Sequence, residues 1–425
     1  MKMTRKGLVA LVLLIISVSM LFAGGSTEKS SSGIQEIEVF TRYSDGVTKE
    51  YFEQVATDFM KENPNVKVTL SSANNQNYKQ EINVRLASSS APDIYYAWSG
   101  EYARQFVDGN RALDITQQLT NDGTWYDSFI KNQFGPFTFS EKIYGIPLMM
   151  DGKAFYYNID IFNDLGLKVP ENWDEFMQVL EVLKKSEYIP ISLGNIEDWA
   201  TGHYMTTLNQ RVVPADVLAK DYALEGDYSN PAYVEALKYL QKMVPYFTPE
   251  FNSVTYDVGI NDFVSGKAAI YYEQFNQVQY IMPATFNWSW FDFPDIIGAE
   301  GDQNALTGAP QGLMVSSATK YPDACIAFLK YLTNSANAEK LVKDAKMFST
   351  VIGAINEKSA DMKQMQIAET IKKASSINLW LDNATDSEVV AVYLSGIQAM
   401  VGGSMTPEQV MATVQKKAAQ VKAEK

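Results

Sequence analysis

The sequence predicts an α/β fold of two domains, and three observations support this prediction. Apolar residues at strand spacing alternate with apolar residues at helical spacing from residue 37 onward, which is typical of a mainly parallel sheet covered by helices. A strand, a linker, a second strand and a helix are predicted to follow one another between residues 142 and 176. The chain has 425 residues, which is enough for two domains that each bury a core.

The N-terminal residues predict export. Met1–Lys6 carries three positive charges, and Leu8–Met20 is apolar but too short for a comfortable membrane span. A small residue, Ala23, follows, so we expect a cleaved secretory signal peptide over residues 1–23. The Ser-rich residues 24–33 predict a flexible tether.

Composition excludes several classes of partner and site. The formal net charge of −14 becomes more negative once the cationic signal is removed, which argues against nucleic acid or an anionic membrane as partner. The single cysteine, Cys325, cannot form an intrachain disulfide, and its apolar surroundings predict a buried thiol. The single histidine, His203, excludes a His-rich metal site and is expected to be satisfied within the fold. We expect no metal and no cofactor.

The first domain begins with three predicted strands and two predicted helices. Pro64 ends the first helix, because a proline disfavours helical backbone in the residue before it. The predicted strands are Ile37–Phe40, Val66–Leu70 and a segment from Ala91 to Tyr96, and the helix faces consist of Phe52, Val55 and Phe59, then Tyr78, Ile82 and Leu86.

The loops after the first and third of these strands contain residues suited to a sugar. Ligands of parallel α/β sheets lie at the carboxyl ends of the strands. Sugars present C–H patches that pack on aromatic rings, and hydroxyls that need both donors and acceptors. Trp98 could instead pack in the core, and Asp45 could cap the following helix. The candidate ligand-binding residues here are Tyr43, Ser44 and Asp45, then Trp98, Ser99 and Glu101.

The stretch from Lys142 to Phe176 predicts a passage between the domains. Its first part, Ile143–Pro147, has an extended pattern, and Pro147 stiffens the linker because its ring fixes φ. Ala154–Tyr157 predicts a second strand. A turn carries Asn158 and Asp160, Asn172 and Glu175 have capping-box spacing, and Trp173, Phe176, Leu180 and Leu183 mark the buried face of a helix.

Two motifs carry a resemblance to a known family. The first is the passage above, with Y-G-I-P at Tyr144–Pro147 and Y-Y-N-x-D-x-F at Tyr156–Phe162. The second is the F-x-x-G-K-A-A run at Phe263–Ala269. Both resemble the extracellular solute-binding proteins of ABC importers, in the sugar-binding branch that includes maltose-binding protein and other oligosaccharide-binding proteins. The resemblance extends over the chain from about Ile37 onward.

The resemblance implies the two-lobe periplasmic-binding-protein fold. Each lobe is expected to be a mainly parallel sheet with helices on both faces, and about three crossings are expected to form a hinge between open and closed forms. The N-terminal lobe would comprise residues 34–149 and 308–346. The C-terminal lobe would comprise residues 150–307 and 347–425.

The resemblance also assigns residues to the ligand site. Trp199, after the first helix of the second lobe, is expected to stack on the ligand, although it could pack in the core. Asp151, at the end of the first linker, is expected to face the ligand, or to be a solvated turn residue. The alternate spacing of Trp288 and Trp290 predicts that at most one of them reaches the ligand. The further ligand-binding candidates are Gln274, Phe275, Trp288, Gln311, Gly312, Phe348, Asp382 and Asn383.

The function that the resemblance implies is that of the substrate-binding component of an ABC transporter. The protein would capture a carbohydrate between its lobes and deliver it to the permease subunits in the membrane. The carbohydrate is expected to be an oligosaccharide. It is expected to be an exported, periplasmic or extracytoplasmic monomer. Many relatives are lipoproteins whose signal ends in a cysteine, whereas Gly24 and Gly25 occupy that place here, which argues against a lipid anchor.

Three other functions stay open at the level of sequence. A ferric-ion binder could use the adjacent tyrosines Tyr156–Tyr157 or Tyr271–Tyr272. A polyamine or peptide binder would suit an acidic cleft. A secreted glycosidase would need two carboxylates at a defined separation, and nothing marks such a pair among 50 acidic residues. We therefore expect no enzyme and assign no catalytic residue.

Overall fold

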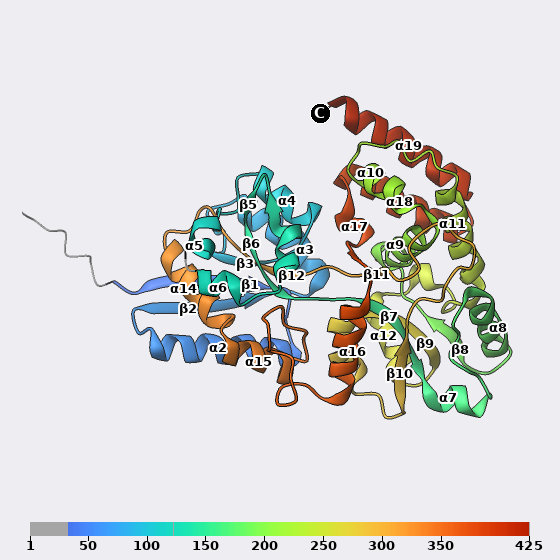
Figure 1. The fold of residues 1–425 in the computed structure, drawn as a ribbon, viewed down its shortest axis with the longest axis horizontal. Helices are drawn as coiled ribbons and strands as arrows, with labels where there is room; N and C mark the ends of the chain where they lie inside the picture. The colour runs from blue at the N-terminus through green and yellow to red at the C-terminus, as the bar shows by residue number, and fades with distance from the viewer. Residues whose placement is uncertain (1–32, 122, 425) are drawn as a thin grey trace, which may run out of the picture.

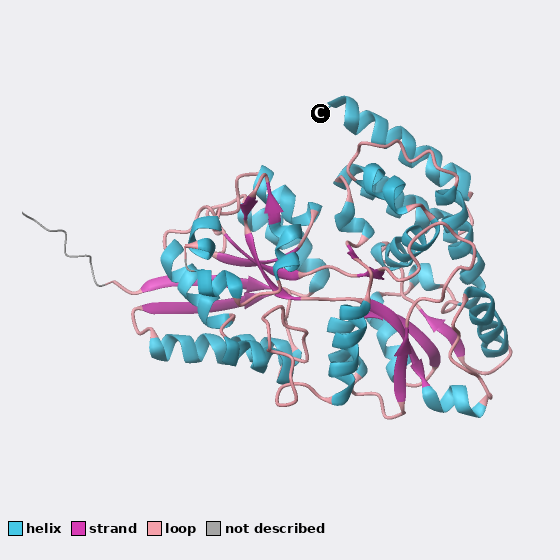
Figure 2. Ribbon diagram, viewed as in Figure 1, coloured by secondary structure: helices cyan, strands magenta, loops and turns pink. Residues whose placement is uncertain are grey.

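The computed structural model describes residues 33–121 and 123–424. The predicted signal peptide and all but the last residue of the predicted tether lie outside the described residues. The described chain forms two lobes, each built around its own sheet and joined by extended segments (Figure 1). Helices surround the strands in both lobes (Figure 2). None of the helices within the described ranges is both long and apolar enough to cross a membrane.

The first lobe contains a five-stranded sheet with the order β2-β1-β3-β12-β6. Helices α14 and α15 come late in the chain, yet they pack beside α2 on this lobe (Figure 1). The strands are β1 (Gln35–Thr41), β2 (Val66–Ser72), β3 (Ile94–Trp98), β6 (Gly145–Met149) and β12 (Gln311–Val315), with a hairpin of β4 (Thr138–Phe139) and β5 (Lys142–Ile143). The helices are α2 (Gly46–Glu62), α3 (Asn75–Leu86), α4 (Glu101–Asp108), α5 (Thr116–Thr120), α6 (Gly123–Asp127), η1 (Lys131–Phe137), α14 (Pro322–Leu332) and α15 (Ser335–Lys343).

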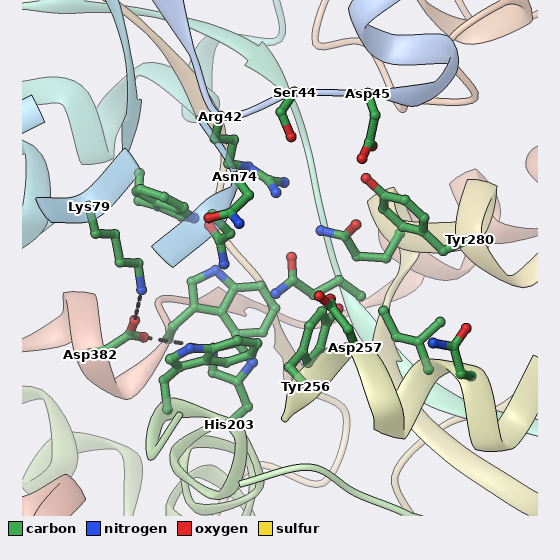
Figure 3. Close-up of a pocket in the computed structure, with 18 residues that line it drawn as sticks. Arg42, Ser44, Asp45, Asn74, Lys79, His203, Tyr256, Asp257, Tyr280 and Asp382 are labelled. Carbon is green, nitrogen blue, oxygen red and sulfur yellow. Dashed lines mark ion pairs between the residues drawn. The ribbon is translucent and has the colours of Figure 1, made fainter. Parts of the chain in front are cut away.

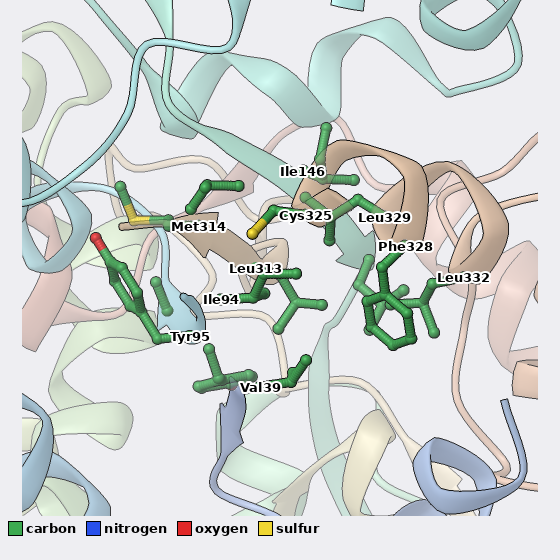
Figure 4. Close-up of a cluster of buried hydrophobic side chains, with 14 of the residues drawn as sticks. Val39, Ile94, Tyr95, Ile146, Leu313, Met314, Cys325, Phe328, Leu329 and Leu332 are labelled. Carbon is green, nitrogen blue, oxygen red and sulfur yellow. The ribbon is translucent and has the colours of Figure 1, made fainter. Parts of the chain in front are cut away.

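The core of the first lobe joins this sheet to its helices (Figure 4). Val39 of β1, Ile94 of β3 and Leu313 of β12 belong to one buried cluster with Phe328 of α14. Each fully buried side chain of this size contributes about 2 kcal/mol of hydrophobic stabilisation. Cys325 lies in the same cluster, so the predicted buried thiol is confirmed, and burial raises the pKa of this thiol to about 12.

The second lobe contains a four-stranded sheet with the order β10-β7-β9-β8. Its core is a second buried cluster, in which α9 and α18 contribute many of the side chains. The strands are β7 (Lys153–Asn158), β8 (Ile189–Ser192), β9 (Ala268–Gln274) and β10 (Trp288–Phe291), beside a small pair of β11 (Leu306–Thr307) and β13 (Ile377–Asn378). The helices are α7 (Ile159–Asp164), α8 (Trp173–Lys184), α9 (Trp199–Val212), α10 (Ala215–Tyr222), α11 (Ala232–Met243), η2 (Val244–Tyr246), η3 (Phe251–Ser253), α12 (Tyr256–Val264), η4 (Phe275–Gln277), α13 (Val278–Ile281), α16 (Met362–Lys373), α17 (Leu381–Ala384), α18 (Ser387–Val401) and α19 (Pro407–Glu424).

The direction of the strands departs in part from the expected mainly parallel sheets. Strand β1 is parallel to β2 and β3, and β8 is parallel to β9, but β12 is antiparallel to β3 and β6, and β7 is antiparallel to β9 and β10. The cause is the hinge: β6 and β9 end there, whereas β7 and β12 begin there. Neighbouring strands that meet the hinge at opposite ends must run in opposite directions.

Two asparagines begin helices in the second lobe. Asn172 Oδ1 accepts a hydrogen bond from Glu175 N (3.1 Å), so α8 begins where predicted. The Glu175 carboxylate accepts from Glu171 N instead of from Asn172 N, so only half of the predicted capping box forms. Asn158 Oδ1 accepts from Asp160 N (3.0 Å), and the predicted turn is the first turn of α7.

The hinge is held together by Asn276, which follows β9. Its Nδ2 donates to Met150 O (2.8 Å), and its backbone N–H donates to Asp151 Oδ1 (3.1 Å), both in the first crossing. Its Oδ1 accepts from Phe348 N (3.3 Å), which precedes the third crossing. In the second crossing, an added Cβ at Gly308 would lie 2.4 Å from Asp151 O, so the two crossings are in close contact. The hinge is therefore narrow and internally hydrogen-bonded.

Side chains beyond the expected boundary after Lys346 still pack in the first lobe. Val351 and Ala354 belong to the buried cluster of the first lobe. Ile367 of α16 packs instead with side chains of the second lobe. We therefore propose that the chain passes to the second lobe between Ala354 and Met362.

Asp151 is buried in the first crossing and is part of the hinge. Its Oδ1 accepts from Gly152 N (2.9 Å), and its Oδ2 accepts from Gln311 Nε2 (2.9 Å) in the second crossing. Gln311 Oε1 in turn accepts from Arg42 (3.4 Å) and from the Tyr96 hydroxyl. Burial raises the pKa of Asp151 to about 7, although the hydrogen bonds to its oxygens oppose that shift.

Gly312 brings β12 against β6. An added Cβ at this position would lie 2.1 Å from Ile146 O. We expected Gly312 to approach the ligand, but its missing side chain instead allows two strands to pack. We expect Gly312→Ala to lower the free energy of unfolding by about 3 kcal/mol, because the backbone of the sheet must shift. Urea denaturation measures this loss.

Gly135→Ala is the control for that substitution. An added Cβ at Gly135 meets no atom within 4 Å, so we expect its free energy of unfolding to stay within about 0.5 kcal/mol of the unchanged protein. Equal losses in the two variants would contradict the packing role of Gly312.

Asp151→Asn tests the cost of the buried carboxyl in the hinge. The folded protein holds the Asp151 proton up to about pH 7, whereas the unfolded chain releases it near pH 3.8, so the folded state binds more protons between these values. This carboxyl therefore makes stability fall as pH rises, by up to about 1.4 kcal/mol for each pH unit in that window. The variant lacks this slope. Urea denaturation from pH 4 to 7.5 measures the free energy of unfolding of both proteins, and we expect the difference between them to change with pH. A difference that stays constant over this range would refute the prediction.

Candidate functional site

A cavity of about 380 Å³ lies between the lobes (Figure 3). First-lobe side chains reach it from the carboxyl ends of β1 and β3 and from the start of α3. Second-lobe side chains reach it from α9, α12, the end of β9 and the start of α17. The cavity therefore lies at the ends of the strands, in front of the hinge.

Three tryptophans from distant parts of the chain line this cavity. Trp98 ends β3, Trp199 begins α9 and Trp380 precedes α17. The His203 ring lies 5.0 Å from the Trp199 ring and stacks at 4.5 Å on Trp380. Lys79 Nζ lies 5.0 Å from the Trp98 ring and 5.7 Å from the Trp199 ring, so it interacts with indoles of both lobes. The cavity wall thus combines three indoles with polar and charged side chains.

Several buried polar atoms of this wall have no hydrogen-bond partner among the described residues. They include the donors Arg42 Nε, Trp199 Nε1 and Trp380 Nε1, and the acceptors Asn75 Oδ1 and Asp382 Oδ1. Buried polar groups are nearly always hydrogen-bonded, and each unpaired one costs about 1–3 kcal/mol. The cavity therefore presents both donors and acceptors that a polar ligand can satisfy.

An ion pair joins the two lobes across the cavity. Lys79 Nζ of the first lobe lies 3.8 Å from Asp382 Oδ2 of the second (Figure 3). Burial lowers the pKa of Lys79 and raises the pKa of Asp382, and the charge of each partner opposes the shift of the other. Burial also lowers the pKa of His203 well below its usual range, and the nearby Lys153 lowers it further. His203 is therefore neutral at pH 7.

Six of the predicted site residues line the cavity. Trp98 and Trp199 are more than nine-tenths buried, and both also border the cavity. Each indole therefore packs in the core on one side and faces the cavity on the other. Asp45 precedes α2, but its side chain makes no capping hydrogen bond and is available to the cavity. The six are Ser44, Asp45, Trp98, Trp199, Gln274 and Asp382.

Five predicted residues belong to the hinge region instead of the cavity wall. Asp151 and Gln311 satisfy each other within the hinge, and Gly312 packs against β6. Phe275 and Phe348 are fully buried, and their rings lie 6.5 Å apart in the apolar cluster behind the hinge. Polar and aromatic residues at a crossing can complete the hinge as well as contact a ligand, and the partners of these five lie within the hinge region.

The remaining five predicted residues also lie outside the cavity wall. Trp288 packs in the second lobe, where Lys363 Nζ lies 3.3 Å from its ring centroid, and Trp290 does not line the cavity either. Glu101 accepts a hydrogen bond from Arg104 Nε (2.7 Å). Tyr43 lies under the Arg42 guanidinium (4.6 Å) and so supports a cavity residue, whereas Ser99 and Asn383 are fully buried.

Twelve cavity residues were not predicted as ligand contacts. Ligands of parallel α/β sheets lie at the carboxyl ends of the strands, so the two asparagines that follow β2 could have been predicted in the same way as the residues after β1 and β3. Trp380 is adjacent to the motif that contains Asp382, and His203 was expected to be satisfied in the fold. No local pattern distinguishes the residues of α12. The twelve are Arg42, Asn74, Asn75, Lys79, His203, Tyr256, Asp257, Ile260, Asn261, Gln277, Tyr280 and Trp380.

The adjacent tyrosines do not form an iron site. The Tyr271 hydroxyl donates to Glu273 Oε2 (2.7 Å), whereas the Tyr272 hydroxyl bonds with Thr207 Oγ1 (2.6 Å). Successive residues of a strand point to opposite faces, so neither this pair nor Tyr156–Tyr157 directs two hydroxyls to one ion. Within the described ranges, no three His, Cys, Asp or Glu side chains are grouped to hold a metal.

Known proteins share this sequence pattern and fold. The chain is 29% identical over 171 residues to a multiple sugar-binding protein of Streptococcus mutans, covering 38% of this chain and 39% of that protein, so it matches less than two thirds of that relative's length. It is 25% identical to the maltodextrin-binding protein MdxE of Bacillus subtilis, covering 88% of this chain and 87% of the relative.

A solved structure supports the fold. It comes from work on xylan utilization by Caldanaerobius polysaccharolyticus and matches with a TM-score of 0.84 at 24% identity, covering 90% of this chain and 99% of that one. The predicted two-lobe α/β fold is confirmed. The model of the bacterial extracellular solute-binding protein family matches residues 45–339, more than half of the chain. The resemblance predicted from the passage between the domains and from the F-x-x-G-K-A-A run is therefore confirmed, and the chain belongs to the family of bacterial extracellular solute-binding proteins.

Proposed function

We propose that the protein is the carbohydrate-binding component of an ABC importer. One observation carries this proposal: the interlobe cavity combines three indole rings with unpaired donors and acceptors. Sugar C–H faces pack on aromatic rings, and each sugar hydroxyl can both donate and accept. The names of relatives that bind maltodextrin, or melibiose, raffinose and stachyose, support an oligosaccharide as the ligand.

Capture follows from the position of the cavity. Its wall is supplied by both lobes, so a sugar that contacts both favours the closed form over an open one. Lys79 and Asp382 already meet across the cavity and place opposite charges at its two walls. We propose that the closed, loaded protein acts outside the cytoplasm as a monomer and delivers the sugar to the permease subunits.

The unpaired donors of the cavity favour a sugar over a polyamine. Two cations, Arg42 and Lys79, line the cavity together with the carboxylates of Asp45, Asp257 and Asp382, so a polyamine would be both attracted and repelled. An ammonium has no acceptor for the indole N–H groups of Trp199 and Trp380, whereas a sugar hydroxyl has one. We also propose that the protein binds its ligand without chemical change, as a solute-binding protein does.

A thermal-shift screen with maltotriose, raffinose and other mono- and oligosaccharides tests the proposal. Binding to the folded state alone adds about 2.7 kcal/mol of stability when the sugar is at one hundred times its Kd, so we expect a higher melting temperature with at least one sugar. Trp199→Ala removes one indole from the cavity, and we expect it to weaken that sugar's affinity about tenfold or more. Isothermal titration calorimetry measures this change.

Trp290→Ala is the matched control, because Trp290 is a partly buried indole of the same lobe that lies outside the cavity. We expect this variant to melt at a lower temperature but to keep the shift caused by sugar. No shift with any saccharide, together with a shift caused by putrescine or by an amino acid, would rule out the proposed carbohydrate ligand.

A further inference from the structure

The only histidine of the chain is held in a fixed orientation at the edge of the cavity. His203 lies on α9 with its ring between those of Trp199 and Trp380. Its Nδ1 lies 2.9 Å from Lys153 Nζ, which is within hydrogen-bond distance. Its Nε2 lies 3.8 Å from Asp382 Oδ1, on the cavity side. The two ring nitrogens therefore have different environments.

Lys153 faces the Nδ1 atom of His203. Its side chain is 3% exposed, and burial lowers its pKa, whereas the carboxylate of Glu273, with Oε1 4.0 Å from Lys153 Nζ, opposes that shift and stabilises the ammonium. An ammonium has three donors and no acceptor, so Nδ1 must accept from it and cannot carry a proton. A neutral imidazole then carries its proton on Nε2. Glu273 is itself held by the hydroxyls of Tyr256 (2.6 Å) and Tyr271 (2.7 Å), so the ammonium has a fixed counter-charge.

The Nε2–H group and Asp382 Oδ1 are suited to one hydroxyl. Asp382 Oδ1 is buried and has no hydrogen-bond partner among the described residues. The 3.8 Å between the two atoms is too long for a direct hydrogen bond. A hydroxyl oxygen about 2.8 Å from each would complete a triangle, accepting from His203 and donating to Asp382.

We propose that Lys153 is a positioning residue that fixes the His203 proton on Nε2, so that His203 and Asp382 together bind one hydroxyl of the ligand. This inference rests on the proposed carbohydrate function, because the hydroxyl belongs to that ligand. Lys153 does not line the cavity itself and acts through the imidazole. A hydroxyl satisfies both atoms at once, whereas a methyl or a hydrogen at the same position satisfies neither.

The state of the imidazole can be read directly by NMR in the full chain without any ligand. Because the chain has a single histidine, two-bond ¹H–¹⁵N spectra of uniformly ¹⁵N-labelled protein give one ring pattern that needs no assignment. We expect Nε2 to be protonated and Nδ1 to be unprotonated at pH 7. Protonation on Nδ1, or on both nitrogens, would overturn the inference.

Lys153→Met tests whether the lysine sets this state. Methionine fills similar space but cannot donate, so we expect protonation on Nδ1 to become populated. Tyr271→Phe is the control, because it removes a hydroxyl from the same buried cluster while leaving the contact between Lys153 and His203 in place. An unchanged proton position in a folded Lys153→Met variant would show that Lys153 does not set it. If that variant does not fold, the spectrum of the unchanged protein still decides the proton position.

Titration with maltotriose and with raffinose separates this inference from the proposed function. A sugar that binds should shift the Nε2 resonance, and we expect Lys153→Met to weaken its affinity about tenfold, the effect of one lost hydrogen bond. If neither these nor other saccharides bind, the proposed function fails while the proton position stands. If a sugar binds without moving the Nε2 resonance, the proposed hydroxyl contact fails while the carbohydrate function stands.

Discussion

The arrangement of the two lobes depends on the hydrogen bonds of one buried amide, that of Asn276. Backbone that passes between domains must be satisfied when it is buried, and Asn276 does this for Met150 and for Phe348 at once. Because Asn276 lies two residues after the end of β9, its bonds hold that end of the strand against the hinge. Gln274 at the end of that strand consequently lines the cavity. The hydrogen bonds of the hinge thus help to hold Gln274 at the cavity.

Polar residues of the hinge and of the cavity are similarly buried but differ in their partners. Asp151 accepts three hydrogen bonds from hinge groups, so its oxygens already have partners within the hinge. Asp382 has an oxygen with no partner, and two cavity tryptophans have unpaired indole N–H groups. This difference separates residues that hold the protein together from residues that are available to a ligand. It also explains why a cavity with three indoles can favour a molecule rich in hydroxyls over a purely apolar one.

Periodicity was sufficient to predict most strands, and the rule for strand ends predicted the general position of the cavity, whereas the two-lobe fold followed from the resemblance to a known family. The sequence did not predict the roles of residues near the hinge. Gln311 lies beside a crossing, where a glutamine can hydrogen-bond either to a ligand or to other hinge residues, and only the structure shows which partners it has. Trp288 illustrates a second limit: spacing shows that a strand has two faces but not which face is turned to the ligand. Lys79 was not predicted because we expected ligand residues only after β1 and β3. It lies in α3, the helix that follows β2, and the carboxyl end of β2 faces the same cavity.

The place of β12 in the first sheet determines when that lobe can be completed. This strand lies between β3 and β6, yet it is encoded more than one hundred and fifty residues after β6 because a large part of the second lobe is inserted between them. A ribosome must therefore synthesise most of the polypeptide before the middle of the sheet exists, and contacts between such distant segments form slowly. The first lobe of a nascent chain with this topology therefore stays incompletely folded until β12 has been synthesised.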